Sequence, residues 1–220
     1  MSAYQLNTLS ACARCPRLVT LRQQTRLEYP NYHAAPVGSW GDARARLLIV
    51  GLAPGLHGAA RTGRAFVGDA SGEFLFACLH RQGFATAVEP RHAKLVGVRI
   101  TNAVKCLPPG NAPIGAEIKA CAGFLRAELD KYCSINARQV RVVVTLGGVA
   151  HRAVCSALGL KEAIFGHGVV HAVSPRVSVV SSFHPSRLNV NTRRLTAEML
   201  DAVFSTSRKL LDGSLVPDAS

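Results

Sequence analysis

The chain has 220 residues, 48% of them hydrophobic, and this length and composition suit a single α/β domain with a full core. No run approaches the roughly 18 apolar residues of a membrane span, and the N-terminal residues lack the apolar core of a signal peptide. We therefore expect a cytoplasmic protein that contacts no membrane. The 26 Lys and Arg against 13 Asp and Glu give a net charge of +13, which favours a polyanionic partner such as nucleic acid. A GC-rich genome, which favours arginine, would produce the same excess.

Four short apolar runs predict buried strands, at 46–50, 98–102, 140–146 and 177–183. Gly, Pro or polar residues follow each run, as expected where a strand ends in a loop. The stretch 19–45 contains scattered Pro and Gly, and we expect it to be irregular.

Segments with helical spacing lie between these strands. The first predicted helix starts with Ser71 as its cap and runs through Leu79. The other predicted helices cover 116–132, 148–158 and 195–211, and Thr196 is the expected cap of the last one. Strands that alternate with helices predict an α/β three-layer sandwich, with a parallel sheet between two layers of helices. We expect one domain over 1–220, frayed from about 214.

The loop after the first predicted strand, 51–72, is crowded with Gly, Pro, Arg and His. In open α/β sheets, ligands bind beyond the carboxyl ends of the strands, so this loop is a candidate binding site. It matches neither the GxxxxGK[ST] phosphate loop nor GxGxxG, which removes the simplest support for ATP hydrolysis and for dinucleotide binding. A second polar segment, 183–189, follows the fourth predicted strand in the same way.

The seven cysteines argue against a disulfide framework in a reducing compartment. One C-x-x-C lies near the N-terminus, and two further cysteines lie after the second strand and on the next helix. These four candidate ligands are Cys12, Cys15, Cys106 and Cys121. Four thiolates suit zinc or a [4Fe–4S] cluster, and four unrelated cysteines are the alternative. Cys133 is the rival fourth ligand, whereas Cys78 and Cys155 occupy helix positions that are expected to face inward.

Two strand-end side chains and one loop aromatic residue have chemistry that suits a nucleobase. The amide of Asn102 offers a donor and an acceptor in one plane, which matches N3–H and O4 of uracil. Phe66 can stack on a flat ligand, and a neutral His184 can stabilise negative charge on a departing base. Each has an ordinary alternative: a turn residue for Asn102, core packing for Phe66, a strand-end histidine for His184, and a helix-capping carboxylate for Asp69.

Arginines and one apolar tip favour contact with DNA. Arg61 and Arg64 are placed to meet phosphates, although single arginines are more often solvated. The polar loop 186–189 has one apolar residue, Leu188, and apolar wedges separate stacked bases. A plain surface loop is the alternative. The candidate DNA-binding residues are Arg61, Arg64, Ser186, Arg187, Leu188 and Asn189.

Three blocks carry a resemblance to a known family: GLAPGLHGAARTGRAFVGDASG at 51–72, TNAVKCLPPGN at 101–111, and HPSRLNVNTRRLT at 184–196. The chain resembles uracil-DNA glycosylases of the iron–sulfur branch, most closely the B-type group called family five. The resemblance implies a four-stranded parallel sheet flanked by helices. It also implies a structural [4Fe–4S] cluster on the cysteines at 12, 15, 106 and 121.

The resemblance also implies roles for the matching residues. Asn102 reads the Watson–Crick edge of the flipped base, Phe66 stacks on it, and His184 faces O2 and stabilises the leaving uracilate. The segment 51–55 is the wall where the catalytic water sits, and 187–189 fills the gap left in the duplex. The implied substrate-binding residues are Gly51, Leu52, Ala53, Pro54, Gly55, His57, Phe66 and Gly68.

One departure from the wider superfamily concerns the water. Most branches carry Asp, Asn or Glu at the position of Ala53 or of its neighbour Leu52, whereas both side chains are apolar here. The B-type group shares this lack, and Asp69 is the candidate that takes over. The resemblance then implies a less strict pocket, with hypoxanthine as a second substrate.

The sequence thus predicts a monomeric DNA-repair enzyme. It would flip a deaminated base out of double-stranded or single-stranded DNA and hydrolyse the N-glycosidic bond, without a divalent metal, to leave an abasic site. Asp69, Asn102 and His184 are its predicted catalytic residues. One alternative is a non-catalytic, zinc-containing α/β module that binds nucleic acid. The other is a hydrolase of free nucleosides or nucleotides.

Overall fold

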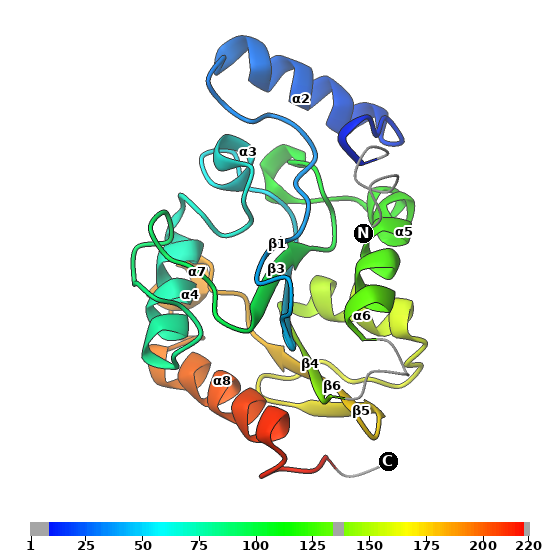
Figure 1. Ribbon diagram of the computed structural model, residues 1–220. Coiled ribbons are helices and arrows are strands. Elements are labelled where there is room, and N and C mark those ends of the chain that lie inside the picture. The colour runs from blue at the N-terminus through cyan, green and yellow to red at the C-terminus, as the bar shows by residue number, and fades with distance from the viewer. Residues whose placement is uncertain (1–8, 134–138, 218–220) are drawn as a thin grey trace.

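The computed structural model describes residues 9–133 and 139–217 (Figure 1). A single six-stranded sheet has the order β1-β3-β2-β4-β6-β5. The strands are β1 (Trp40–Gly41), β2 (Leu47–Gly51), β3 (Val98–Asn102), β4 (Arg141–Leu146), β5 (Val170–Ser174) and β6 (Val177–Ser182). No helix among the described residues is long and apolar enough to cross a membrane. The end of the expected frayed tail, 218–220, lies outside the described residues.

The four central strands are the four that the apolar runs predict, within one residue at each end, and all their pairings are parallel. The four-stranded sheet expected from the resemblance is therefore the centre of a larger one. At the edges, β1 pairs antiparallel with β3, and β5 pairs antiparallel with β6. The two edge strands escaped prediction because β1 has only two residues and because no residue of β5 is fully buried, so neither is an apolar run.

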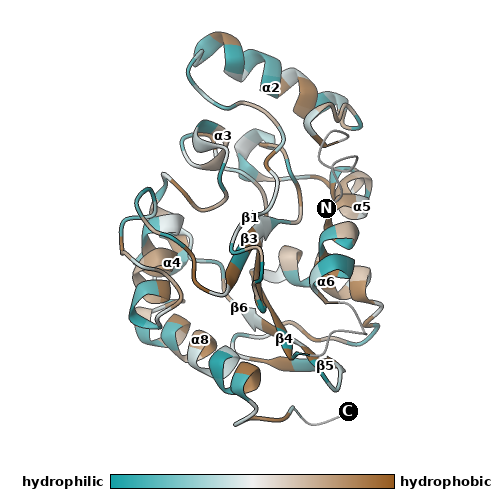
Figure 2. Cartoon of the chain, in the orientation of Figure 1, coloured by the Kyte–Doolittle hydropathy of each residue, from teal (hydrophilic) through white to brown (hydrophobic). Residues whose placement is uncertain are grey.

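Two helices cover each face of the sheet (Figure 1). Helices α4 (Ala70–Arg81) and α8 (Ala197–Asp212) pack on one face, and α5 (Gly115–Tyr132) and α6 (Gly148–Leu158) pack on the other. Figure 2 shows both brown and teal along α8, as expected of a helix with one buried side. The α/β three-layer sandwich is confirmed.

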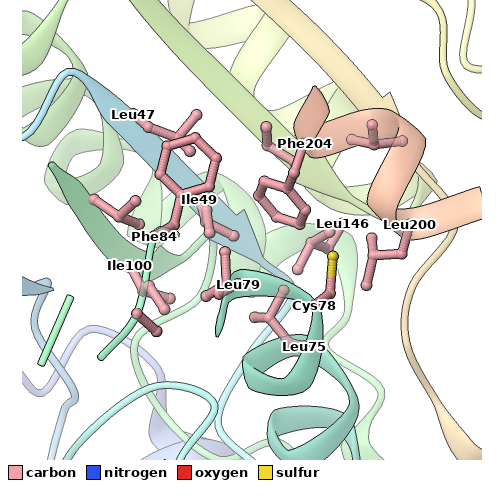
Figure 3. Packing of buried hydrophobic residues seen from close by; sticks show 14 of the residues in the cluster. Leu47, Ile49, Leu75, Cys78, Leu79, Phe84, Ile100, Leu146, Leu200 and Phe204 are labelled. Atoms are coloured by element: carbon pink, nitrogen blue, oxygen red, sulfur yellow. The ribbon is translucent and has the colours of Figure 1, made fainter. Parts of the chain in front are cut away.

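Residues of β2 alternate between the two layers, because successive side chains of a strand point to opposite faces. Leu47 and Ile49 join the cluster under α4 and α8, whereas Leu48 and Val50 join the cluster under α5 and α6. In the first cluster, side chains from α4 and α8 meet those of the strands, as Leu79 does with Ile49 (Figure 3). This packing holds the sheet rigid and fixes where the strands end.

Helix α2 (Pro16–Glu28) corrects the expectation of an irregular segment over 19–45. Only Leu18 and Thr25 of this helix are buried, so no apolar stripe marks it in the sequence. Pro16 occupies its first turn, where a missing N–H has no cost. Three shorter helices complete the fold: α3 (Ala59–Thr62), η1 (Pro109–Asn111) and α7 (Arg187–Asn191).

The caps of the two helices on the first face follow the sequence in one case and not in the other. Thr196 caps α8 as predicted, since its side chain accepts from the Met199 N–H. Helix α4 is capped by Asp69 and not by Ser71, which lies inside the first turn. The Asp69 carboxylate reaches the Gly72 N–H at 2.9 Å. Asp69 is therefore fixed in position by the start of α4.

Candidate active site

A cavity of about 600 Å³ lies beyond the carboxyl ends of β2, β3 and β6. The four predicted nucleobase residues, from separate parts of the chain, all line it: Phe66, Asp69, Asn102 and His184. The predicted wall and loop residues that also line it are Leu52, Ala53, Gly55, His57, Gly68, Ser186 and Arg187. Gly51 lies directly beneath Phe66 and Asn102, while the remaining wall residue, Pro54, is buried next to the cavity.

Gly51 allows two of these side chains to approach the main chain at the end of β2. A Cβ atom at this position would lie 2.5 Å from Oδ1 of Asn102 and 2.6 Å from Cε2 of Phe66. Real Cβ atoms do not approach other atoms so closely, so any residue larger than glycine would displace the amide or the ring. The glycine at the strand end therefore shapes the cavity floor.

The backbone of Phe66 adopts a left-handed conformation with φ of 60°, which is unfavourable for an aromatic residue. The surrounding structure enforces it: a Cβ at Gly72 would lie 2.1 Å from the Phe66 carbonyl oxygen. The ring is 7% exposed, and its centroid lies 5.9 Å from that of His184 with an interplanar angle of 34°. Such strain is typical of functional sites, where it holds a side chain in one direction.

The two carboxylate oxygens of Asp69 have different neighbours. Oδ1 accepts the Gly72 N–H at the start of α4. Oδ2 lies over the glycine loop, where a Cβ at Gly58 would be 2.0 Å away and a Cβ at Gly55 would be 3.4 Å away. The capping role and the predicted catalytic role are therefore compatible, because each uses a different oxygen.

His184 is half-buried in the cavity wall, two residues after β6. Burial lowers its pKa, and the negative charge of Asp69 opposes that shift only in part. The imidazole is therefore neutral at pH 7 and has one N–H to donate. Gly147 passes close behind it, since a Cβ there would lie 3.3 Å from Cβ of His184.

The loop after His184 is braced by its own side chains. Ser186 caps α7 by accepting from the Asn189 N–H, and Nδ2 of Asn189 donates to the His184 carbonyl at 2.8 Å. Leu188 is 72% exposed on the outer side. An apolar tip on a braced turn has the form that the predicted wedge requires.

A second cavity, lined by all four predicted cysteine ligands, lies where the N-terminal segment meets α5: Cys12, Cys15, Cys106 and Cys121. The rest of its wall is largely apolar and includes Leu9, Leu18 and Phe124. The rival ligand Cys133 lies elsewhere, in the cluster under α5 and α6. Cys78 and Cys155 are buried, as predicted.

The four thiols do not form a compact site for one ion. Over residues 9–133 and 139–217, no three His, Cys, Asp or Glu side chains are close enough together to hold one metal ion. Four thiolates suit either zinc or a [4Fe–4S] cluster, and these four thiols line one cavity. Burial raises the pKa of Cys106 to about 12 and also raises the pKa of Cys121, so a metal bound by these thiolates would displace protons.

Comparison with known proteins adds independent evidence. The family model described as "Uracil DNA glycosylase superfamily" matches residues 39–207. The chain belongs to this superfamily. It is 45% identical over 208 residues to a type-5 uracil-DNA glycosylase of Pyrobaculum aerophilum, which covers 90% of this chain and 88% of the relative.

Two further type-5 uracil-DNA glycosylases are similar over nearly the whole chain. That of Mycobacterium tuberculosis is 41% identical, covering 95% of this chain and 82% of the relative. That of Thermus thermophilus is 40% identical, covering 93% of this chain and 96% of the relative. Within the uracil-DNA glycosylase superfamily, the chain therefore belongs to the type-5 group.

Two of the predicted DNA contacts of this glycosylase fold lie outside the base cavity. Nη2 of Arg61 donates to the Gly68 carbonyl at 3.0 Å, so this guanidinium holds the loop together. The guanidinium of Arg64 lies 5.4 Å from the ring centroid of Trp40. Of the predicted basic contacts, Arg187 alone lines the cavity.

Sequence reasoning missed several residues of the glycosylase site. Asn111, in the second resemblance block, lines the cavity with a positive φ of 57°. Oη of Tyr32 lies 2.9 Å from Nδ1 of His57, and its ring stacks on Tyr29 at 4.5 Å. The sequence around Tyr32, YPNYH at 29–33, carries no motif, so only the fold brings this aromatic pair next to His57 at the cavity.

Proposed function

We propose that the protein excises uracil from DNA by hydrolysing the N-glycosidic bond, which leaves an abasic site. The observation that carries this proposal is the single cavity shared by Phe66, Asp69, Asn102 and His184, in a chain of the type-5 family. The cavity opens to solvent beyond the carboxyl ends of the central strands, where a nucleotide can enter only after it leaves the base stack.

Base recognition rests on two side chains that touch the floor at Gly51. The ring of Phe66 supplies a flat apolar surface for stacking, and the amide of Asn102 supplies a donor and an acceptor in one plane. Its oxygen can accept N3–H of uracil while its nitrogen donates to O4. The buried surroundings of Asn102, which is 3% exposed, strengthen such bonds relative to water.

Bond cleavage separates charge, and two side chains that line the cavity, His184 and Asp69, stabilise the separated charges. The electron pair of the C1′–N1 bond leaves with uracil as an anion, and the sugar becomes an oxocarbenium ion. The neutral His184 donates its N–H toward O2 and stabilises the anion; one such donor contributes about 3–4 kcal/mol in other enzymes. Oδ2 of Asp69 offsets the sugar's positive charge and holds the water that attacks C1′. The proton of this water passes to the Asp69 carboxylate and then to solvent, and the uracil anion is protonated from solvent.

The surface around the cavity supports binding to duplex DNA. Leu188 fills the gap left by the extruded nucleotide, and Arg187 beside it contacts the backbone. The net charge of +13 supplies further phosphate contacts, so affinity should fall steeply as salt rises. We expect the protein to act as a monomer, which light scattering at micromolar concentration tests.

Hypoxanthine is the proposed second substrate. The wall near the base is formed by Leu52 and Ala53, which have no polar group to reject a purine. The cavity volume of about 600 Å³ also leaves room for a two-ring base.

The cysteines at 12, 15, 106 and 121 would hold a [4Fe–4S] cluster, which would supply a structural link. It would tie the N-terminal segment to the loop after β3 and to α5, which position Asn102 and η1. The backbone N–H of Lys105 already donates to Sγ of Cys121 at 3.3 Å, as amides do to cluster sulfurs. A brown protein containing iron and sulfide supports this assignment, and a colourless one containing zinc contradicts it.

The function is tested with duplexes that carry uracil, hypoxanthine or thymine opposite each base, incubated with excess enzyme and cleaved with alkali. We expect strand breaks at uracil and at hypoxanthine, and none at thymine. The same enzyme is offered free deoxyuridine. Release of uracil from the nucleoside without cleavage of DNA would overturn the proposal in favour of a nucleoside hydrolase.

A further inference from the structure

A lysine and a glutamate form an ion pair in the interior of the protein. Nζ of Lys105 lies 2.6 Å from Oε2 of Glu128, and both side chains are 0% exposed. Neither side chain lines the base cavity, so neither can touch substrate. Lys105 lies in the loop after β3, and Glu128 lies on α5.

Stability does not account for this pair. Removing two charges from water carries a large desolvation cost, and apolar residues of similar volume are often as stable or more stable in such positions. In several proteins, a buried charged group specifies one arrangement of the chain, and this is a second reason for keeping such a pair. The contacts of this pair should therefore reveal which arrangement it specifies.

All three protons of the Lys105 ammonium are used. Besides Glu128, Nζ donates to Oγ1 of Thr101 at 2.6 Å and to the backbone carbonyl of Asn102 at 2.8 Å. The Thr101 hydroxyl donates to Oε2 of Glu128 at 2.8 Å, and Oε1 of Glu128 accepts the Ser39 N–H at 3.3 Å. This closed network is centred on the last two residues of β3.

The main chain of Lys105 is held as well. Its N–H donates to Sγ of Cys121, and its carbonyl accepts the Val37 N–H at 2.7 Å. Residue 105 therefore cannot shift without breaking contacts on both its side chain and its backbone. The Asn102 carbonyl is anchored to a fixed point.

We propose that Lys105 and Glu128 are positioning residues for base recognition, which hold the peptide after Asn102 so that its amide meets the base edge. This inference rests on the proposed function. The side-chain direction of Asn102 depends on its backbone, and its Oδ1 already fits within 2.5 Å of where a Gly51 Cβ would be. A small rotation of the last β3 peptide would remove the amide from the plane of the base.

The main test is the double variant Lys105→Met/Glu128→Gln. It removes both charges and nearly keeps side-chain volume. The single Gln oxygen can accept the Ser39 N–H while its NH2 group donates to Oγ1 of Thr101, so the contact to the Asn102 carbonyl is the one lost without replacement. The readout is the ratio of dissociation constants for a duplex with an abasic analogue over one with 2′-fluorodeoxyuridine, which resists cleavage. This ratio isolates recognition of the base from binding of the backbone.

We expect the ratio to fall about tenfold, which corresponds to one good hydrogen bond, while affinity for the abasic duplex stays unchanged. Iron content and visible absorbance should match the wild type. The matched control is Arg126→Met/Asp130→Asn, which removes an exposed ion pair of the same helix α5. The control should keep the wild-type ratio.

A folded double variant that contains iron and keeps the wild-type ratio would overturn the inference. If the double variant does not fold, Thr101→Val removes one hydroxyl from the same network and should lower the ratio in the same direction; an unchanged ratio again overturns the inference. The proposed function fails separately, if the wild type itself binds the 2′-fluorodeoxyuridine duplex no more tightly than one with thymidine.

Discussion

The carboxylate of Asp69 combines a structural task with a proposed chemical one at a single residue. Its Oδ1 caps the N-terminus of α4 by accepting the Gly72 N–H, and its Oδ2 faces the glycine loop of the cavity. Sequence reasoning identified both roles as alternatives, since a carboxylate before a helix is usually a cap. The geometry shows that the cap is what aims the second oxygen.

Asp69→Asn separates the two tasks. Asn caps a helix as well as Asp does, so stability should change by less than about 0.5 kcal/mol. Loss of the charge should lower the single-turnover rate of uracil excision about 10- to 100-fold, with DNA affinity unchanged. Quenched single-turnover assays and fluorescence anisotropy measure the two quantities. An unchanged rate would remove Asp69 from the mechanism.

Asn102→Ala tests whether this residue reads the base. Without the amide, the uracil edge stays unpaired in the cavity, which should reduce the uracil excision rate about 10- to 100-fold. Hypoxanthine excision should fall less, because a purine presents a different edge. Rates on matched duplexes compare the two bases. Equal losses would show that Asn102 positions the strand and does not read the base.

Helix α7 is short, but its cap and the bond from Asn189 to the His184 carbonyl fix its direction. Leu188→Ala removes the apolar tip and leaves this bracing in place. Activity on duplex DNA should fall about tenfold, whereas activity on single-stranded DNA should change little, because only the duplex needs its gap filled. The control is Val96→Ala, an exposed apolar residue just before β3, at the opposite edge of the sheet. Equal losses on both substrates would reject the wedge.

The elements differ in how much of them the sequence shows. The central strands are buried on both faces, so each is a continuous apolar run and is predicted within one residue. Helix α2 rests on two buried residues and on its contact with the cysteine cavity, so its position depends on partners distant in the sequence.

At the scale of the whole molecule, three histidines link stability to pH. Burial lowers the pKa of His151, His167 and His184 below the ordinary value of 6.5. The unfolded chain then binds more protons than the folded one as pH falls through about 6.5, so the free energy of unfolding should decrease over that range.

Urea denaturation at pH 8, 7, 6 and 5.5 measures this dependence. Asp201 and Glu117 have lowered pKa values as well, but their contribution is lost only in more acidic solution, below about pH 5. The histidines and the carboxylates therefore change stability in separate pH ranges. His167→Gln should reduce the loss of unfolding free energy between pH 7 and pH 5.5. If the unfolding free energy of the wild type rises as the pH is lowered over this range, the assignment is wrong.

The sequence by itself determined the layered α/β architecture and the four central strands, and its resemblance to a family named the four residues that line the cavity. It could do so because apolar periodicity and strand-end residues are local signals. Only the tertiary structure decided which oxygen of Asp69 faces the cavity, that Cys121 and not Cys133 lines the cysteine cavity, and that Lys105 pairs with Glu128. These features depend on contacts between residues far apart in the chain, which form only when the sheet and its helices bring those residues together.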